Sequence, residues 1–293
     1  MKKITRRSFL AVCGTVATAA ALTACGGSAS SATASTASSA AGSAAAGTLS
    51  GNVATGGSTS MKNVIAALTE GFAEVEPGVT VSYDPTGSGA GITGATDKTL
   101  DIGLSSRALK DDEKNAVDGT TVALDGIAII VNKDSKVADL TVGQLKQMFT
   151  GEITNWSEVG GDDGEIVLIG REAGSGTRDG FESILGIKEK CAYEAELPET
   201  GDVKAKISSD EAAIGYISFA SVSDGVKALQ VGGVTVSTDT IADNSYVIQR
   251  PFVHAYVKGT KDDLVLAYLD FLKTDKAQEL IESEHLVPVE FWK

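Results

Sequence analysis

The chain has 293 residues, of which 42% are hydrophobic, and a formal net charge of −14. Its length is sufficient for two modest domains with cores of their own. Because a strongly acidic protein repels phosphodiester backbones, the charge argues against nucleic-acid binding, and any site for a small anion must be built from local dipoles and a few placed cations.

The first 24 residues have the features of a secretory signal peptide. An apolar stretch over residues 9–22 follows a basic segment and is too short to span a bilayer comfortably. The residues Leu22-Thr23-Ala24-Cys25 resemble the lipobox of bacterial lipoproteins, which implies that Cys25 becomes the lipid-modified (palmitate-bearing) first residue. An ordinary signal peptide with an incidental cysteine is the alternative. Arg6-Arg7 also resembles a twin-arginine signal, so the twin-arginine and general secretory routes both stay open.

Residues 26–47 are nearly all Ser, Ala, Gly and Thr and carry no charge. Such a segment cannot bury enough apolar surface to offset its ordering entropy, so we expect a flexible tether before the folded body at residues 48–293. Of the three cysteines, only Cys191 falls in this body. We therefore expect no internal disulfide, and the body must rely on its hydrophobic core.

Hydrophobic periodicity in the body predicts strands that alternate with helices. Helical spacing of apolar residues predicts a helix at 61–72, and alternation predicts a strand at 79–83. An almost continuous apolar run at 122–131 is typical of a strand buried in an α/β sheet. Further strands are expected at 100–104, 166–169, 213–219 and 253–257, and further helices around 145–149, 181–185, 264–272 and 277–281. The pattern indicates an α/β fold.

Three junctions between a strand end and a helix start carry candidate chemistry. Helix N-termini expose unpaired N–H groups and partial positive charge, glycine permits close approach of the backbone, and Ser and Thr add hydroxyl donors. Arg171, just before the third junction, adds a planar cationic fork. Each junction alone is also a common helix cap, but together they predict a site for a tetrahedral oxyanion. The junctions are Gly57-Ser58-Thr59-Ser60, Thr86-Gly87-Ser88-Gly89 and Gly174-Ser175-Gly176-Thr177-Arg178.

Two motifs in these loops point to other functions but lack the context they need. Gly89-Ala90-Gly91-Ile92-Thr93-Gly94 matches a dinucleotide fingerprint, yet the next strand runs into Ser105-Ser106-Arg107, where an acidic residue for the ribose is expected. Ala173 replaces the first glycine of a hydrolase nucleophile elbow at Ser175. Neither His254 nor His285 has a triad context or metal-ligand spacing, so we expect no catalytic residue, metal or cofactor.

The body resembles the phosphate-binding proteins of ABC importers, within the type II periplasmic-binding-protein class. The resemblance covers nearly all of residues 50–293 and rests on the order and spacing of the three junctions, of the segment Asp101-Ile102-Gly103-Leu104-Ser105-Ser106-Arg107, and of residues 149–156, 213–216 and 246–251. It implies two α/β lobes joined by two crossover segments, with the ligand in the cleft between them. Lobe I would comprise residues 48–126 plus 252–293, and lobe II residues 127–251.

The resemblance also implies which residues bind phosphate. Some relatives carry an aspartate at the position of Ser106, where it accepts the proton of monohydrogen phosphate and repels fully ionised sulfate. Here we expect Arg107 to contribute charge and a backbone carbonyl or another acceptor to receive that proton; a salt bridge of Arg107 is the alternative. The phosphate-binding residues implied by the resemblance are Thr59, Ser60, Ser88, Arg171, Ser175, Gly176 and Thr177. Ser58 of the first junction, Ser106 and Arg107 complete the expected set.

These features predict an extracytoplasmic lipoprotein, anchored to the cell membrane through Cys25, that binds inorganic phosphate. Its expected partners are the permease and ATPase subunits of a phosphate ABC importer, and we expect a monomer without enzymatic activity. The alternatives are a binding protein for another oxyanion such as sulfate or molybdate, a phosphate-ester hydrolase, and a sensory or adhesive lipoprotein.

Overall fold

The computed structural model describes residues 49–289. The predicted signal peptide, Cys25 and the whole predicted tether fall within residues 1–48, outside this range. Residues 49–289 lie within one compact unit. Among the helices at residues 49–289, none combines the length and the apolar character that a bilayer crossing requires.

A sheet that contains ten of the strands in residues 49–289 organises the fold, and its main path runs β2-β1-β3-β11-β4-β8-β6-β7. The first part of β4 pairs antiparallel with β11 and its last part pairs antiparallel with β8. The apolar run predicted as a buried strand forms the second half of β4. The strands are β1 (Gly51–Gly57), β2 (Val79–Asp84), β3 (Ile102–Ser105), β4 (Val117–Asn132), β5 (Asp139–Leu140), β6 (Val167–Arg171), β7 (Ala195–Leu197), β8 (Ala213–Ser218), β9 (Val226–Ala228), β10 (Gln230–Val231), β11 (Gln249–Val257) and β12 (Val287–Pro288).

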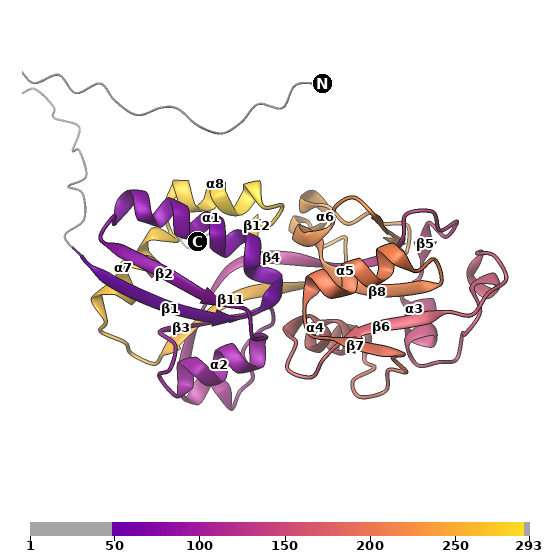
Figure 1. Cartoon of the computed structure of the whole chain (residues 1–293), viewed down its shortest axis with the longest axis horizontal. Helices are drawn as coiled ribbons and strands as arrows, with labels where there is room; N and C mark the ends of the chain where they lie inside the picture. The colour runs from indigo at the N-terminus through magenta and orange to yellow at the C-terminus, as the bar shows by residue number, and fades with distance from the viewer. Residues whose placement is uncertain (1–48, 290–293) are drawn as a thin grey trace, which may run out of the picture. The chain divides into compact units, whose positions relative to one another are not determined.

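Helices flank the sheet in two groups that β4 and β11 connect (Figure 1). Helices α1, α2, α7 and α8 lie with β1, β2 and β3, whereas α3 to α6 lie with β6, β7 and β8. The helices are α1 (Lys62–Val75), α2 (Ser88–Thr96), α3 (Val142–Phe149), α4 (Gly176–Leu185), α5 (Thr200–Ser209), α6 (Thr238–Ala242), α7 (Asp263–Phe271) and α8 (Asp275–Ser283), with short 3₁₀ turns η1 (Thr59–Met61), η2 (Glu113–Asn115), η3 (Trp156–Val159) and η4 (Phe219–Ser221).

Each group of elements has its own large hydrophobic cluster, and we call the two groups the first and the second lobe. The cluster of the first lobe runs along β4 as far as Ala123, and that of the second lobe begins at Ile127. On the return path, Ile248 packs in the second cluster and Phe252 in the first. The chain therefore passes from one core to the other along β4 and returns along β11.

Every strand and helix predicted from periodicity is present, with ends shifted by a few residues. Two elements of the site were not predicted. Strand β1 is rich in glycine and is held by parallel pairing with β2 on one side and β3 on the other, which local composition does not reveal. Helix α5 has a weakly apolar sequence. Ile184 of α4 is 38% exposed, whereas Phe181 and Leu185 of the same helix are buried.

His254 lies on β11 in the interior of the first lobe and stacks on Tyr268, with ring centroids 5.9 Å apart. Within residues 49–289, its two ring nitrogens and the Tyr268 hydroxyl have no hydrogen-bond partner. Burial lowers the pKa of His254 to about 3, so its ring is neutral at physiological pH. His254 is thus part of the core and not of a site.

Candidate functional site

Four helical segments begin just after the carboxyl ends of strands. β1 is followed by η1, β2 by α2, β6 by α4 and β7 by α5. Because β1 pairs in parallel with β2, and β6 with β7, the carboxyl ends of each pair lie at one edge of the sheet. The first residues of a helix have N–H groups without intrahelical partners, so each start contributes donors and partial positive charge.

Hydroxyl groups from the two lobes contact one another where these helical segments begin. The Ser60 Oγ of the first lobe lies 2.9 Å from Thr177 Oγ1 of α4. The neighbouring Thr59 Oγ1 lies 3.1 Å from Thr200 Oγ1 of α5. The backbones of the two lobes are also in contact, because the Gly89 N–H donates to the Gly174 carbonyl at 3.0 Å. The structure thus brings three predicted residues together and adds Thr200.

A second contact between the lobes is made around Gly176. Ser88 Oγ, at the start of α2, lies 3.2 Å from Ser106 Oγ and accepts a hydrogen bond from the Ser106 N–H at 3.0 Å. A Cβ atom built on Gly176 would lie 2.3 Å from Ser88 Oγ and 2.7 Å from Ser106 Oγ. Only glycine therefore lets α4 approach these two serines so closely.

Arg171, at the end of β6, supplies a buried cation. Its side chain is 2% exposed and donates to Thr59 Oγ1 at 3.0 Å, to Thr200 Oγ1 at 3.3 Å and to two backbone carbonyls. No carboxylate within residues 49–289 forms an ion pair with it. Burial lowers its pKa to about 10, so the guanidinium remains charged at neutral pH. A buried charge without a counterion is costly, and an anion would compensate it.

Arg250, which was not among the predicted site residues, brings a second guanidinium to the hydroxyl cluster. It lies on β11 directly opposite Asp125 of β4, and both side chains are buried. Its Nη2 donates to Asp125 Oδ2 at 3.0 Å and to Ser60 Oγ at 3.2 Å, and its Nη1 donates to the Ser106 carbonyl at 3.1 Å. The signal that could have revealed this pair is Asp125 itself, a charged residue within an apolar strand.

Several of the hydroxyl oxygens already accept a hydrogen bond from an N–H group. Arg171 donates to Thr59 and Thr200, Arg250 to Ser60, and the Ser106 N–H to Ser88. A hydroxyl oxygen that accepts from an N–H directs its own proton elsewhere, so these groups are oriented as donors. A cluster of donors with a net positive charge suits a ligand whose oxygens only accept.

The remaining predicted residues shape the loops. Ser175 Oγ caps α4 by accepting from the Arg178 N–H at 3.3 Å, which places Gly176 and Thr177 in the first turn. Ser58 is buried, its carbonyl accepts from the Tyr83 hydroxyl at 2.8 Å, and its side chain does not cap η1. Ser58 therefore positions the turn through its backbone.

The Arg107 side chain points away from the hydroxyl cluster. Its guanidinium forms ion pairs with Glu113 at 2.7 Å and with Asp179 of α4 at 2.9 Å, and it contacts none of the hydroxyls described above. Two carboxylates hold the charge of Arg107 in this arrangement, so its contribution to an anion stays a prediction that its contacts do not support. The alternative, a salt bridge, describes its contacts, and one of these bridges joins the two lobes.

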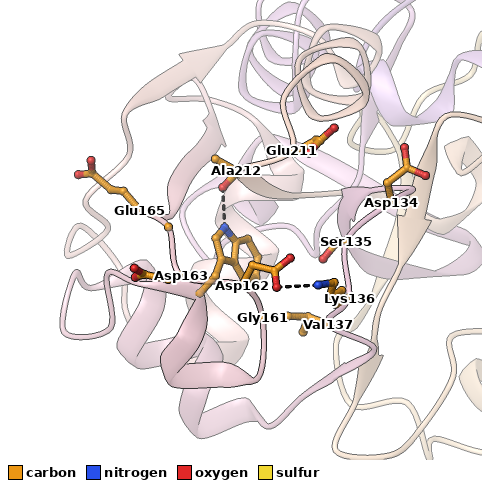
Figure 2. Close-up of a pocket in the computed structure, with 12 residues that line it drawn as sticks. Asp134, Ser135, Lys136, Val137, Gly161, Asp162, Asp163, Glu165, Glu211 and Ala212 are labelled. Carbon is orange, nitrogen blue, oxygen red and sulfur yellow. Dashed lines mark hydrogen bonds and ion pairs between the residues drawn. The ribbon is translucent and has the colours of Figure 1, made fainter.

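A separate pocket of about 230 Å³ lies in the second lobe near Trp156 (Figure 2). Its lining includes five carboxylates, and Lys136 pairs with one of them, Asp162. The Trp156 indole donates to the Ala212 carbonyl at 2.9 Å. Such walls repel anions, so this pocket is not an alternative to the hydroxyl cluster as an oxyanion site. The carboxylates are Asp134, Asp162, Asp163, Glu165 and Glu211.

Comparison with known proteins gives consistent matches. Residues 30–276 match the PBP superfamily domain. The phosphate-binding protein PstS of Bacillus subtilis is 32% identical over 255 residues, which cover 82% of this chain and 81% of that protein.

Solved structures match as well. A substrate-binding protein of Clostridium perfringens assigned to phosphate ABC transport, solved with bound phosphate, is 39% identical and has a TM-score of 0.79 over 82% of this chain and all of the other. An ABC-type phosphate transport receptor of Vibrio cholerae is 33% identical, with a TM-score of 0.70 over the same shares of the two chains. These matches confirm the predicted two-lobed α/β fold of the periplasmic-binding-protein class.

Proposed function

The chain belongs to the PBP superfamily and to the family of PstS phosphate-binding proteins within it, and from this premise we propose that it binds inorganic phosphate between its lobes and delivers it to an ABC importer. The family consists of substrate-binding transport proteins and not of enzymes. A phosphate-ester hydrolase is thereby set aside.

The observation that carries the proposal is the buried, uncompensated charge of Arg171 among hydroxyl groups oriented as donors. Phosphate offers oxygen acceptors and negative charge, the two properties that this cluster lacks. Phosphate would replace the direct hydroxyl–hydroxyl contacts across the cleft and hold the lobes together. The proposed ligands are Thr59, Ser60, Ser88, Ser106, Arg171, Ser175, Gly176 and Thr177, with Thr200 added and Ser58 shaping the loop.

We assign the lobes as residues 48–126 plus 252–293 and residues 127–251. This division is supported by the change of hydrophobic cluster between Ala123 and Ile127 and between Ile248 and Phe252. Closure then consists of a change in angle at the two crossovers, which gives the importer a difference in shape between the loaded and the empty protein.

We further propose that the protein works outside the cytoplasm as a monomer anchored through a lipid on Cys25. The support is the signal-like N-terminus, the Leu22-Thr23-Ala24-Cys25 segment and the uncharged tether region that follows it. Permease and ATPase subunits of a phosphate importer would be its partners. Mass spectrometry of the protein from membranes tests the anchor, because cleavage before Cys25 and a lipid on that residue are expected.

A second oxyanion, sulfate, is favoured by one observation. Position 106 carries a serine, and within residues 49–289 no carboxylate contacts the donor hydroxyls directly, since Asp125 reaches Ser60 only through Arg250. A hydroxyl can either donate or accept, so Ser106 does not repel an unprotonated anion as a carboxylate would.

Calorimetric titration with phosphate and then with sulfate tests the proposal. The protein should first be unfolded and refolded, because a tightly held anion can survive dialysis. We expect one-to-one phosphate binding of micromolar affinity or tighter, about −8 kcal/mol or better. Equal binding of sulfate would make the protein a general oxyanion receptor, and no response to either anion would overturn the assignment.

A further inference from the structure

Arg250 occupies a junction between the hinge strands and the hydroxyl cluster. Its side chain is 3% exposed, and its Nε and Nη2 atoms hold the Asp125 carboxylate at 3.2 and 3.0 Å. The other Asp125 oxygen accepts from the Ser218 hydroxyl at 2.9 Å. The carboxylate is therefore fully occupied on the side away from the cluster, and it fixes the guanidinium plane.

The same guanidinium reaches both serine-bearing loops of the first lobe. Nη2 donates to Ser60 Oγ at 3.2 Å, and Nη1 donates to the Ser106 carbonyl at 3.1 Å. Because Ser60 Oγ accepts from this cation, its own proton is available to Thr177 or to a ligand in the cleft. Arg250 thus sets the donor direction of Ser60 and the position of Ser106.

The charges next to the hydroxyl cluster include Arg250 as well as Arg171. Arg171 contributes one positive charge that no carboxylate within residues 49–289 pairs with directly, whereas the dianion of phosphate carries two negative charges. Arg250 is the further cation in contact with the cluster, and Asp125 opposes it from behind. Its charge is therefore only partly neutralised on the side that faces Ser60.

We propose that Arg250 is the second cation of the anion site and that Asp125, as its counterion, sets how strongly the site attracts the anion. The inference rests on the proposed function. Arg250 acts on the ligand through Ser60 and Ser106 and through its field, so it is a positioning residue. Asp125 then has two opposite effects: it holds the arginine in place and it reduces the charge that the anion experiences.

Two substitutions separate this role from a purely structural one. Arg250→Gln leaves a buried carboxylate unpaired, and Asp125→Asn leaves a buried guanidinium unpaired, so both are expected to lower thermal stability. Their effects on phosphate affinity should have opposite signs. We expect Arg250→Gln to weaken phosphate binding by about 10- to 100-fold. Asp125→Asn should tighten it by roughly threefold or more and make it fall more steeply with added salt.

Further variants guard against loss of folding. The double variant Arg250→Gln/Asp125→Asn contains no buried charge at this point, so it should fold and still bind phosphate weakly. Arg250→Lys retains the charge without the fork and should bind more tightly than Arg250→Gln. Lys206→Gln, which removes an exposed cation paired with Asp210, is the control for a simple change in net charge and should bind like the unmodified protein.

The readout is phosphate calorimetry at several salt concentrations, alongside thermal unfolding of each variant. Wild-type affinity in the double variant, or an equal loss of affinity in both single variants, would overturn the role of Arg250 while leaving phosphate binding intact. An unmodified protein that binds no phosphate would overturn the proposed function, and this inference with it.

Discussion

Gly176→Ala is predicted to prevent full closure of the lobes without disturbing either of them. Gly176 is the first residue of α4, and its φ is not in the left-handed region, so alanine suits the helix itself. The added methyl group would face the first lobe. There it would lie 2.3 Å from Ser88 Oγ, 2.7 Å from Ser106 Oγ and 2.9 Å from Ser88 Cβ.

The size of the effect follows from these distances. Ordinary contacts of a Cβ atom begin near 3.4 Å, so Ser88 Cβ at 2.9 Å, which is attached to the backbone of α2, must retreat by about 0.5 Å. Rotation of the Ser88 hydroxyl relieves only the shortest contact and breaks its hydrogen bond from the Ser106 N–H. Overpacking of this kind costs about 1–3 kcal/mol. The cost falls on the closed form alone, so phosphate affinity should drop about 5- to 150-fold.

Calorimetry and thermal unfolding of the ligand-free protein measure the two halves of this prediction. The matched control is Gly201→Ala in the first turn of α5, where an added Cβ atom meets nothing within 4 Å. We expect Gly176→Ala to lose affinity at unchanged stability, and Gly201→Ala to change neither. Wild-type affinity in Gly176→Ala would show that α4 and the two serines do not approach each other in the bound form.

Three other substitutions test further features. Arg171→Met removes a buried cation that has no ion pair, so calorimetry should show at least a roughly 100-fold loss of phosphate affinity. The unfolding temperature of the ligand-free protein should stay the same or rise, because the cost of burying the charge is removed. Lower stability with intact affinity would contradict this prediction. Asp179→Asn removes the ion pair with Arg107 that joins the lobes. Because Asp179 is partly exposed, the effect should be modest, and stopped-flow measurements should show about a three- to tenfold faster release of phosphate. Equal release rates would show that the ion pair does not stabilise the closed form. His254 has a folded pKa of about 3 against about 6.5 when unfolded, so the folded state binds fewer protons and loses stability as the pH falls below 6.5. His254→Phe should therefore raise the free energy of unfolding by about 2 kcal/mol relative to the unmodified protein at pH 5 but not at pH 7.5, as measured by urea unfolding. Equal changes at both pH values would contradict this prediction.

Much of the arrangement could be anticipated because its signals are local. Glycine and hydroxyl residues between a strand and a helix mark places where N–H groups are free, and the structure brings Thr59, Ser60, Ser88 and Thr177 to one place. Arg171 could be predicted for the same reason, since it ends a strand immediately before such a loop. Periodicity predicted an α/β fold, whereas the division into two lobes was implied by the resemblance to phosphate-binding proteins.

The remaining features depend on contacts between distant segments. Arg250 and Asp125 are 125 positions apart and meet because β11 pairs with β4 in one particular register. Thr200 begins a helix whose sequence has little apolar periodicity. Arg107 follows a strand that ends near the cluster, as predicted, but its long side chain turns toward Glu113 and Asp179. Backbone position could be inferred from pattern, whereas the direction of a flexible side chain could not.

The placement of β11 has a consequence for the order in which the chain assembles. This strand lies between β3 and β4 in the sheet although it follows both at a long distance along the chain. The buried residues of the second lobe's core all lie between positions 127 and 248, with Leu124 and Val287 packed at its margin, so this core can condense as soon as that segment is available. The first lobe, by contrast, has an open sheet edge until β11 arrives. Loss of the chain after residue 248 therefore removes an interior strand and not a tail. A protein shortened in this way keeps one lobe able to fold and leaves the other with the exposed edge that promotes aggregation.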